Sequence, residues 1–245
     1  MNIVAIIQAR TNSTRFPNKV FANLVGKPLI WHVVNRLSFC KKIDNIVLAT
    51  TTNPKDDDLE FWALDNHVNY FRGSEENVLS RYYYAAVKSN ADVIVRITAD
   101  DPFKDPVIID KVISMVINDS LDFGFNNSPA TFPEGLDVEV FTFESLERAF
   151  NQSRSEYEQE HVTQFMYRNS SMFKMKNFTH KSDLSHFRWT IDTAADFEMV
   201  KRVYESLYKE ERVFCYEDIL SLLDQYPEIS LINQGVERSD MYKKK

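Results

Sequence analysis

The feature that most restricts the fold of this chain is an alternation of apolar runs and helical segments up to about residue 120. The apolar runs have the length of strands, as at 4–8, 45–51, 68–72 and 92–98. Between them, apolar residues recur at helical spacing, as in 29–37. Strands that alternate with helices form βαβ units around a parallel sheet. We therefore predict a single Rossmann-like α/β domain with a mainly parallel, mixed sheet.

The second half of the chain has a less regular pattern, which predicts a small extension of strands and helices. An irregular segment at 126–135 separates two of its apolar runs. The expected strands are 121–125, 136–141, 172–178 and 187–191, and the expected helices are 143–151, 156–168, 194–208 and 217–225. The basic tail 241–245 is expected to be disordered.

Composition disfavours several classes of protein. A formal net charge of −7 over 245 residues, without a basic stripe, argues against binding to a nucleic acid. Cys40 and Cys215 are too few for a disulfide framework or a zinc site, so we expect free, buried thiols. No apolar stretch approaches the roughly 18 residues of a membrane span, and the N-terminus lacks a signal-peptide pattern. The sequence predicts a cytoplasmic protein without a membrane partner.

The loop after the first strand contains groups that bind anions. Arg10, Arg15 and Lys19 lie there with small polar side chains such as Ser13. The loop follows a strand, and the carboxyl ends of strands are where such sheets bind ligands. Guanidinium forks and a lysine ammonium both suit phosphate. Neither the Walker pattern nor the dinucleotide-binding glycine pattern is present, and from composition alone a solvated surface loop is the better interpretation.

Asp100 directly follows the strand-like run 93–97. Magnesium prefers oxygen ligands, and it usually takes one or two carboxylates together with the phosphates of a substrate. The neighbouring Asp101 precedes Pro102 and can stabilise a turn. We assign the metal to Asp100 and the turn to Asp101.

Asp192 follows a second strand-like run, 187–191. An acidic residue three positions after a threonine is a common pattern at the start of a helix, and Thr193 with Asp196 fits it. About half of such matches are only helix caps. Because Thr193 can do the capping, Asp192 is left as the second candidate ligand of Mg²⁺.

Several longer motifs occur in order along nearly the whole chain. They are Ile7-Gln8-Ala9-Arg10, 13–19, Gly26-Lys27-Pro28-Leu29-Ile30, Phe71-Arg72-Gly73-Ser74, Asn77-Val78-Leu79, Arg96-Ile97-Thr98-Ala99-Asp100-Asp101-Pro102, Gly135-Leu136-Asp137-Val138-Glu139-Val140, Glu160-His161-Val162-Thr163 and Arg188-Trp189-Thr190-Ile191-Asp192-Thr193. This series resembles the spore-coat-polysaccharide type of cytidylyltransferase, which is related to the KDO and acylneuraminate cytidylyltransferases and belongs to the nucleotide-diphospho-sugar transferase superfamily. The chain departs from the family at Ala99, where glycine is usual, and at Ala194, where proline is usual.

The resemblance implies a magnesium-dependent transfer of CMP from CTP to an anionic acceptor with release of pyrophosphate, for the synthesis of a surface polysaccharide such as a capsule. It implies catalytic roles for Arg10, Arg15, Lys19, Asp100 and Asp192, of which Asp100 and Asp192 bind Mg²⁺. The implied nucleotide-binding residues are Gln8, Ala9, Arg10, Ser13, Arg15, Lys19, Arg72, Gly73, Ser74, Arg96, Ala99 and Asp100. Transfer from UTP or GTP and a non-catalytic nucleotide-binding module of the same fold are the alternatives.

The acceptor site is expected in the second half of the domain. The candidate residues are Glu134, Asp137, Glu139, Arg154, His161 and Arg188. For His161, a structural role is as good an interpretation as a contact with a ligand. By resemblance, we divide the domain 1–240 into a nucleotide-binding half, 1–120, and an acceptor-binding half, 121–240, which we also expect to form a homodimer.

Overall fold

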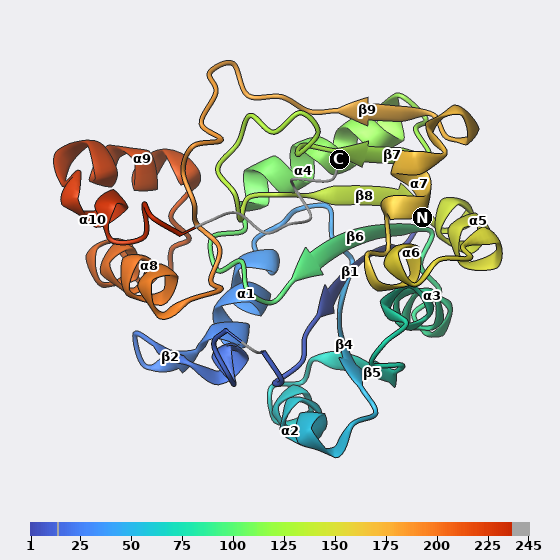
Figure 1. The fold of residues 1–245 in the computed structure, drawn as a ribbon, viewed down its shortest axis with the longest axis horizontal. Coiled ribbons are helices and arrows are strands. Elements are labelled where there is room, and N and C mark those ends of the chain that lie inside the picture. The colour runs from blue at the N-terminus through green and yellow to red at the C-terminus, as the bar shows by residue number, and fades with distance from the viewer. Residues whose placement is uncertain (14, 237–245) are drawn as a thin grey trace.

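The computed structural model describes residues 1–13 and 15–236 of the chain, so the expected basic tail 241–245 lies outside the described residues. A seven-stranded sheet runs through both halves, with its strands in the order β5-β4-β1-β6-β8-β7-β9 (Figure 1). The strands are β1 (Ile3–Gln8), β4 (Asn45–Thr51), β5 (Asn69–Gly73), β6 (Val93–Thr98), β7 (Phe123–Phe125), β8 (Glu139–Thr142) and β9 (Met175–Asn177). The pairs from β5 to β6 are parallel, whereas β8 pairs antiparallel with β6 and with β7. The predicted α/β fold with a mixed sheet is confirmed.

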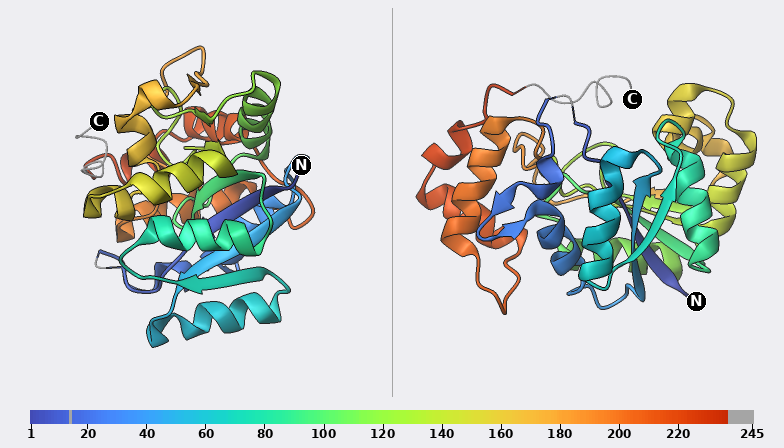
Figure 2. Two further views of the ribbon diagram at one scale, coloured as in Figure 1. Left: turned by 90° about the vertical axis from the view of Figure 1, so that its right-hand side faces the viewer. Right: turned by 90° about the horizontal axis from the view of Figure 1, so that it is seen from below.

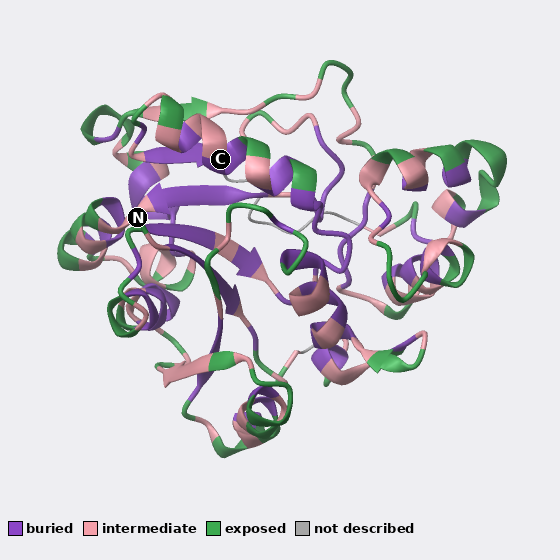
Figure 3. Cartoon of the chain, turned by 180° about the vertical axis from the view of Figure 1, so that it is seen from behind, coloured by how far each residue is buried: buried purple, intermediate pink, exposed green. Residues whose placement is uncertain are grey.

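Helices cover both faces of this sheet (Figure 2). Buried residues of α1 (Leu29–Leu37), α4 (Pro106–Asn118) and α8 (Ala194–Leu207) share one core, while those of α3 (Val78–Lys88) and α5 (Phe143–Gln152) share another. β1 supplies both cores because its side chains alternate, with Ile3, Ala5 and Ile7 on one face and Val4 and Ile6 on the other. The central strands are therefore buried on both faces, as Figure 3 shows.

The remaining elements extend this framework. They are the short pair β2 (Asn23–Leu24) and β3 (Lys27–Pro28), the helices α2 (Asp57–Asp65), α6 (Glu156–Glu160), α7 (Gln164–Arg168), α9 (Tyr216–Gln225) and α10 (Glu228–Leu231), and the single 3₁₀ turns Lys19–Phe21, Pro54–Asp56 and Ser170–Met172. In Figure 1, α8, α9 and α10 form a group beside α1. Within the described ranges, no helix is both long and apolar enough to cross a bilayer.

Two predictions for the second half were wrong. Residues 187–191 form no strand, because the only bridge there joins Glu134 to Arg188. The single helix expected at 156–168 is instead α6 and α7, separated at Val162, whose φ of 39° lies in the left-handed region. A β-branched residue rarely adopts that conformation, so periodicity alone could not reveal the break.

The other differences concern where elements begin. The strand expected at 136–141 starts only at Glu139, because the Asn126 side chain bonds Leu136 O and Val138 N ahead of it.

Both thiols are free, as expected, but only Cys40 is buried and Cys215 is half-buried.

Candidate active site

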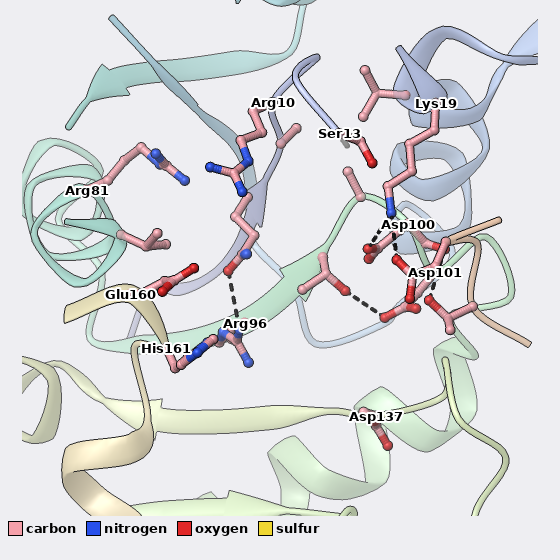
Figure 4. Close-up of a pocket in the computed structure, with 18 of the residues that line it drawn as sticks. Arg10, Ser13, Lys19, Arg81, Arg96, Asp100, Asp101, Asp137, Glu160 and His161 are labelled. Atoms are coloured by element: carbon pink, nitrogen blue, oxygen red, sulfur yellow. Dashed lines mark hydrogen bonds and ion pairs between the residues drawn. The ribbon is translucent and has the colours of Figure 1, made fainter. Parts of the chain in front are cut away.

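A cleft of about 1170 Å³ lies at the carboxyl ends of β1 and β6. Residues from 9–13, 15–20, 74–81 and 98–101 line it from the first half of the chain, and residues from 127–139, 156–161 and 190–192 line it from the second. Figure 4 shows the side chains that point into it. The cleft therefore lies where ligands bind in open α/β sheets.

Lys19 joins the two aspartates that the sequence singled out. Its Nζ donates to Asp100 Oδ2 at 2.9 Å and to Asp192 Oδ1 at 3.1 Å, and also to the carbonyl of Ile191 at 2.6 Å (Figure 4). Burial alone would lower the pKa of Lys19, but the two carboxylates outweigh it and raise this pKa. Conversely, burial opposes ionisation of Asp100, yet Lys19 holds the pKa of this carboxyl below its usual value. We call Lys19, Asp100, Asp101 and Asp192 the acidic end of the cleft.

Both oxygens of Asp192 contact cations. Oδ1 accepts from Lys19, and Oδ2 lies 3.0 Å from Arg15 Nη2 and 3.0 Å from Arg188 Nη2. The helix α8 begins just beyond, and the Thr193 side chain and Asp196 form the predicted capping box at its N-terminus. The cap does not use the Asp192 side chain, which is why this carboxylate can face the cleft.

Asp101 has a larger role than the turn assigned to it. Its buried carboxylate accepts from Thr98 Oγ1 at 2.6 Å and lies 2.9 Å from Lys104 Nζ, a lysine that is only 2% exposed. Burial and the charge of Asp100 raise the pKa of Asp101, although Lys104 acts in the opposite direction. Lys104 also donates to the carbonyl of Asp137, so it ties the end of β6 to the second half of the chain.

Two arginines face each other at the opposite end of the cleft. Arg10 comes from the loop and Arg81 from α3, and their guanidinium groups point toward one another (Figure 4). Arg81 is 2% exposed and donates to Ser74 O at 2.6 Å. Burial, and secondarily the charge of Arg10, lower the pKa of Arg81. Among the described residues neither arginine forms an ion pair with a carboxylate, so this cationic corner suits an anion.

A buried network lies under the middle of the cleft. Arg96 Nη1 donates to Glu139 Oε2 at 2.6 Å, and Glu139 also accepts from Thr163 and Tyr167. Burial disfavours the charged form of Arg96, but the Glu139 carboxylate raises its pKa overall. Arg96 Nη2 bonds Gln8 Oε1 at 3.3 Å, which places Gln8 at the cleft surface. The network joins β6, β8 and the α6–α7 segment.

The comparison with known sequences decides the family of this chain. A model of the family described as "Cytidylyltransferase" matches residues 4–235. The chain belongs to the cytidylyltransferase family. It is therefore a nucleotidyltransferase, and the resemblance inferred from the ordered motifs is confirmed.

Two relatives and one solved structure match this chain along almost their full length. An uncharacterized protein of Methanocaldococcus jannaschii is 37% identical over 240 residues, 96% of each chain. The spore coat polysaccharide biosynthesis protein SpsF of Bacillus subtilis is 31% identical over 93% of this chain and 96% of its own. The solved structure of a cytidylyltransferase from Leptospira borgpetersenii superposes with a TM-score of 0.91 at 33% identity, covering 97% of this chain and 100% of that one.

Another likeness covers only part of the chain. The 3-deoxy-manno-octulosonate cytidylyltransferase of Geobacter metallireducens is 32% identical over 120 residues, which is 49% of this chain and 46% of that enzyme. The relation to KDO cytidylyltransferases expected from the sequence therefore rests on about half of the chain.

Most residues that the motifs assigned to this cytidylyltransferase site do line the cleft. They are Gln8, Ala9, Arg10, Ser13, Arg15, Lys19, Ser74, Arg96, Ala99, Asp100, Glu134, Asp137, Glu139, His161 and Asp192. The structure brings these residues to one cleft, and their roles toward a ligand stay predictions.

Four assigned residues lie outside the lining: Arg72, Gly73, Arg154 and Arg188. The Arg72 side chain bonds Thr51 O and Asn53 O and pairs with Asp57 and Glu60, so it holds an edge strand in place. Arg154 is exposed and donates to nearby backbone carbonyls. Arg188 is buried among carboxylates behind the cleft.

Other lining residues were not found from the sequence. Among them are Arg81, Asp101, Lys104, Asn127, Glu160 and Thr190. Glu160 and Asp101 lie within the family motifs 160–163 and 96–102, and this position could have marked them as site residues. Nothing in the sequence marked Arg81 or Lys104 as a site residue, because a single cation on a helix or turn is more often solvated.

The acidic end fits a hard divalent cation. Asp100 and Asp192 supply carboxylate oxygens that both contact the ammonium group of Lys19. In the described part of the chain, no cluster of three or more His, Cys, Asp or Glu side chains is suited to hold a metal. Two carboxylates, with the remaining positions left to water and phosphate oxygens, match the usual coordination of Mg²⁺. A zinc-type site with nitrogen or sulfur ligands does not match this arrangement.

Proposed function

We propose that this cytidylyltransferase transfers CMP from CTP to an anionic acceptor, with Mg²⁺ bound by Asp100 and Asp192 and with release of pyrophosphate. The observation that carries the proposal is the contact of a single ammonium, Lys19 Nζ, with both carboxylates in a cleft beside Arg15. Cations and metal-binding carboxylates in one cleft are what a triphosphate with its metal requires.

The residues of the chain position the reactants. Arg10, Arg15 and Lys19 offer donors to the β- and γ-phosphates and stabilise the charge that grows on the leaving pyrophosphate. Asp100 and Asp192 would hold Mg²⁺, which would supply Lewis-acid stabilisation of phosphate charge when bound. The residues that line the cleft from the second half of the chain, from Glu134 to His161, would bind the acceptor.

The acceptor class is an acidic sugar or a small phosphorylated metabolite, used in building a surface polysaccharide. Support comes from the likeness to SpsF, named for spore coat polysaccharide biosynthesis, and to a cytidylyltransferase of a sugar acid. The homodimer and the cytoplasmic location expected from the sequence are part of the same proposal.

A pyrophosphate-release assay tests the proposal. Each of CTP, UTP, GTP and ATP is combined with a panel of sugar acids and small phosphates, with Mg²⁺ or with EDTA. We expect release only with CTP, an anionic acceptor and Mg²⁺. Turnover that prefers UTP or GTP, or that is undiminished by EDTA, would overturn the proposal.

The variant Asp100→Asn tests the metal assignment separately. We expect its kcat to fall by about 100-fold or more, with a smaller change in CTP affinity, because the metal counts most in the transition state. Asp110→Asn is the matched control, since Asp110 accepts from the backbone of Lys41 and Lys42 and does not line the cleft.

A further inference from the structure

Arg188 is a buried arginine whose guanidinium contacts three carboxylates behind the cleft. Its Nε and Nη2 donate to the two oxygens of Asp196 at 2.9 and 3.1 Å, which makes this pair bidentate. Nη2 also donates to Asp192 Oδ2 at 3.0 Å, and Nη1 lies 3.0 Å from Glu134 Oε1. The side chain is 7% exposed and does not line the cleft. All three nitrogens lie within 3.1 Å of a carboxylate oxygen, and the side chain is buried outside the cleft lining, so Arg188 does not contact the space where an anionic acceptor would bind.

Asp196 anchors Arg188 to the start of α8. This carboxylate is fully buried, and it accepts from the backbone N–H groups of Asp192 at 3.1 Å and Thr193 at 2.9 Å. Burial works against its charged form, but the hydrogen bonds from Arg188 and Asn233 keep the pKa of Asp196 below its usual value. The same carboxylate therefore caps the helix, fixes Arg188 and holds the backbone of Asp192.

Asn233 completes the arrangement from the C-terminal side of α10. Its buried Nδ2 donates to Asp196 Oδ1 at 2.9 Å and to the carbonyl of Arg188 at 3.0 Å. Both bonds join segments far apart in the sequence. The helical group α8 to α10 is thus tied through Asn233 to the residue pair that contacts Asp192.

We propose that Arg188, Asp196 and Asn233 form a brace that positions the Asp192 carboxylate for the metal and Glu134 for the cleft. Lys19 and Arg15 approach Asp192 from the cleft side, so Arg188 is the contact that holds it from behind. A ligand carboxylate fixed by an outer hydrogen bond needs no reorientation when a cation binds, and loss of such partners typically weakens metal binding 10–100-fold. This inference rests on the proposed role of Asp192, and it makes Arg188 and Asn233 positioning residues.

The experiment measures binding of Mn²⁺, as a probe for the Mg²⁺ site, by electron paramagnetic resonance of the free ion without substrates. Asn233→Ala removes two hydrogen bonds of the brace but no charge. Asn2→Ala is the matched control, because Asn2 Nδ2 also donates to two backbone carbonyls, at 2.8 and 2.9 Å, outside the cleft lining. We expect the urea midpoint to shift more in Asn233→Ala, whose bonds are buried and include one to a carboxylate, and we expect about tenfold weaker Mn²⁺ binding only in this variant.

A second variant keeps the charge and changes the geometry. Arg188→Lys cannot bridge three carboxylates with one ammonium, so we expect it to fold and to bind Mn²⁺ about tenfold more weakly, with kcat partly restored at high Mn²⁺. If Asp192→Asn loses Mn²⁺ binding while Asn233→Ala and Arg188→Lys keep it, the brace is overturned and the metal site stands. If Asp192→Asn binds Mn²⁺ as the unaltered protein does, the metal assignment and the brace fall together.

Discussion

Replacing Lys19 by methionine removes the ammonium that lies between Asp100 and Asp192 while it keeps most of the side-chain volume. In the unaltered protein that ammonium is 2.9 and 3.1 Å from one oxygen of each carboxylate. Breaking a buried ion pair typically costs 3–5 kcal/mol, because the remaining charge is left uncompensated. The Asp100 side chain is 29% exposed, so water screens part of the loss, and we expect a cost near the lower limit, about 3 kcal/mol.

That cost appears in thermal unfolding. For a chain of this size each kcal/mol lowers Tm by roughly 2–4 °C, so Lys19→Met should melt roughly 6–12 °C below the unaltered protein. Magnesium should reverse part of the loss. A ligand at ten times its Kd stabilises a protein by about 1.4 kcal/mol, and a cation is more favourable beside two carboxylates that have lost their ammonium.

The assay is differential scanning fluorimetry with MgCl₂ and with NaCl at equal ionic strength. Lys201→Met is the control, because Lys201 forms only an exposed pair with Glu205 at 3.8 Å. We also expect the kcat of Lys19→Met to fall by about 100-fold. The account of the acidic end would be refuted if Lys19→Met had the same Tm as the unaltered protein. It would also be refuted if MgCl₂ raised the Tm of the variant by no more than it raises the Tm of the unaltered protein.

Three further predictions concern stability. Gly135→Ala should cost about 2 kcal/mol or more in urea unfolding, since φ is +101° and a Cβ would lie 2.8 Å from the Trp189 carbonyl carbon. Glu139→Gln should cost about 3 kcal/mol by the same measurement, because it leaves the charge of Arg96 buried without its partner. Burial lowers the pKa of His32 to about 4, so the folded state binds fewer protons than the unfolded state below pH 6.5. The free energy of unfolding should therefore fall by up to about 3 kcal/mol from pH 7 to pH 4, and His32→Phe should flatten this dependence.

The first half of the fold could be predicted because its signals are local. The runs at 4–8, 45–51 and 92–98 coincide with β1, β4 and β6 to within a residue. Each of these strands is buried on both faces, so a continuous apolar run marks it. The run at 187–191 is as buried as a strand, with Trp189 and Ile191 fully covered, yet it pairs only at Glu134. A sequence shows that a segment is buried but not whether a partner strand lies beside it.

The candidate site was predictable where function depends on the position of the backbone. Asp100 comes just after the end of β6 and Lys19 lies at the end of the loop after β1, so both stand at the carboxyl edge of the sheet, where ligands bind. The positions of two arginine side chains, Arg72 and Arg188, could not be predicted from the sequence. Arg72 reaches back to carbonyls and carboxylates of its own neighbourhood, and Arg188 turns away from the cleft into three carboxylates. Which way such a side chain turns depends on tertiary contacts that periodicity does not encode.

The distribution of charge divides the cleft into two unequal parts. At the acidic end the cations Lys19 and Arg15 are already paired with carboxylates, so a triphosphate arriving without a metal would compete with those pairs. Arg10 and Arg81 have no such partner in the described part of the chain, although Arg81 is buried. A magnesium complex of a nucleoside triphosphate is still an anion. Two arginines without carboxylate partners can balance the negative charge that the metal does not neutralise. We expect the acidic end to bind the metal and the cationic corner of Arg10 and Arg81 to bind the remaining negative charge of the triphosphate.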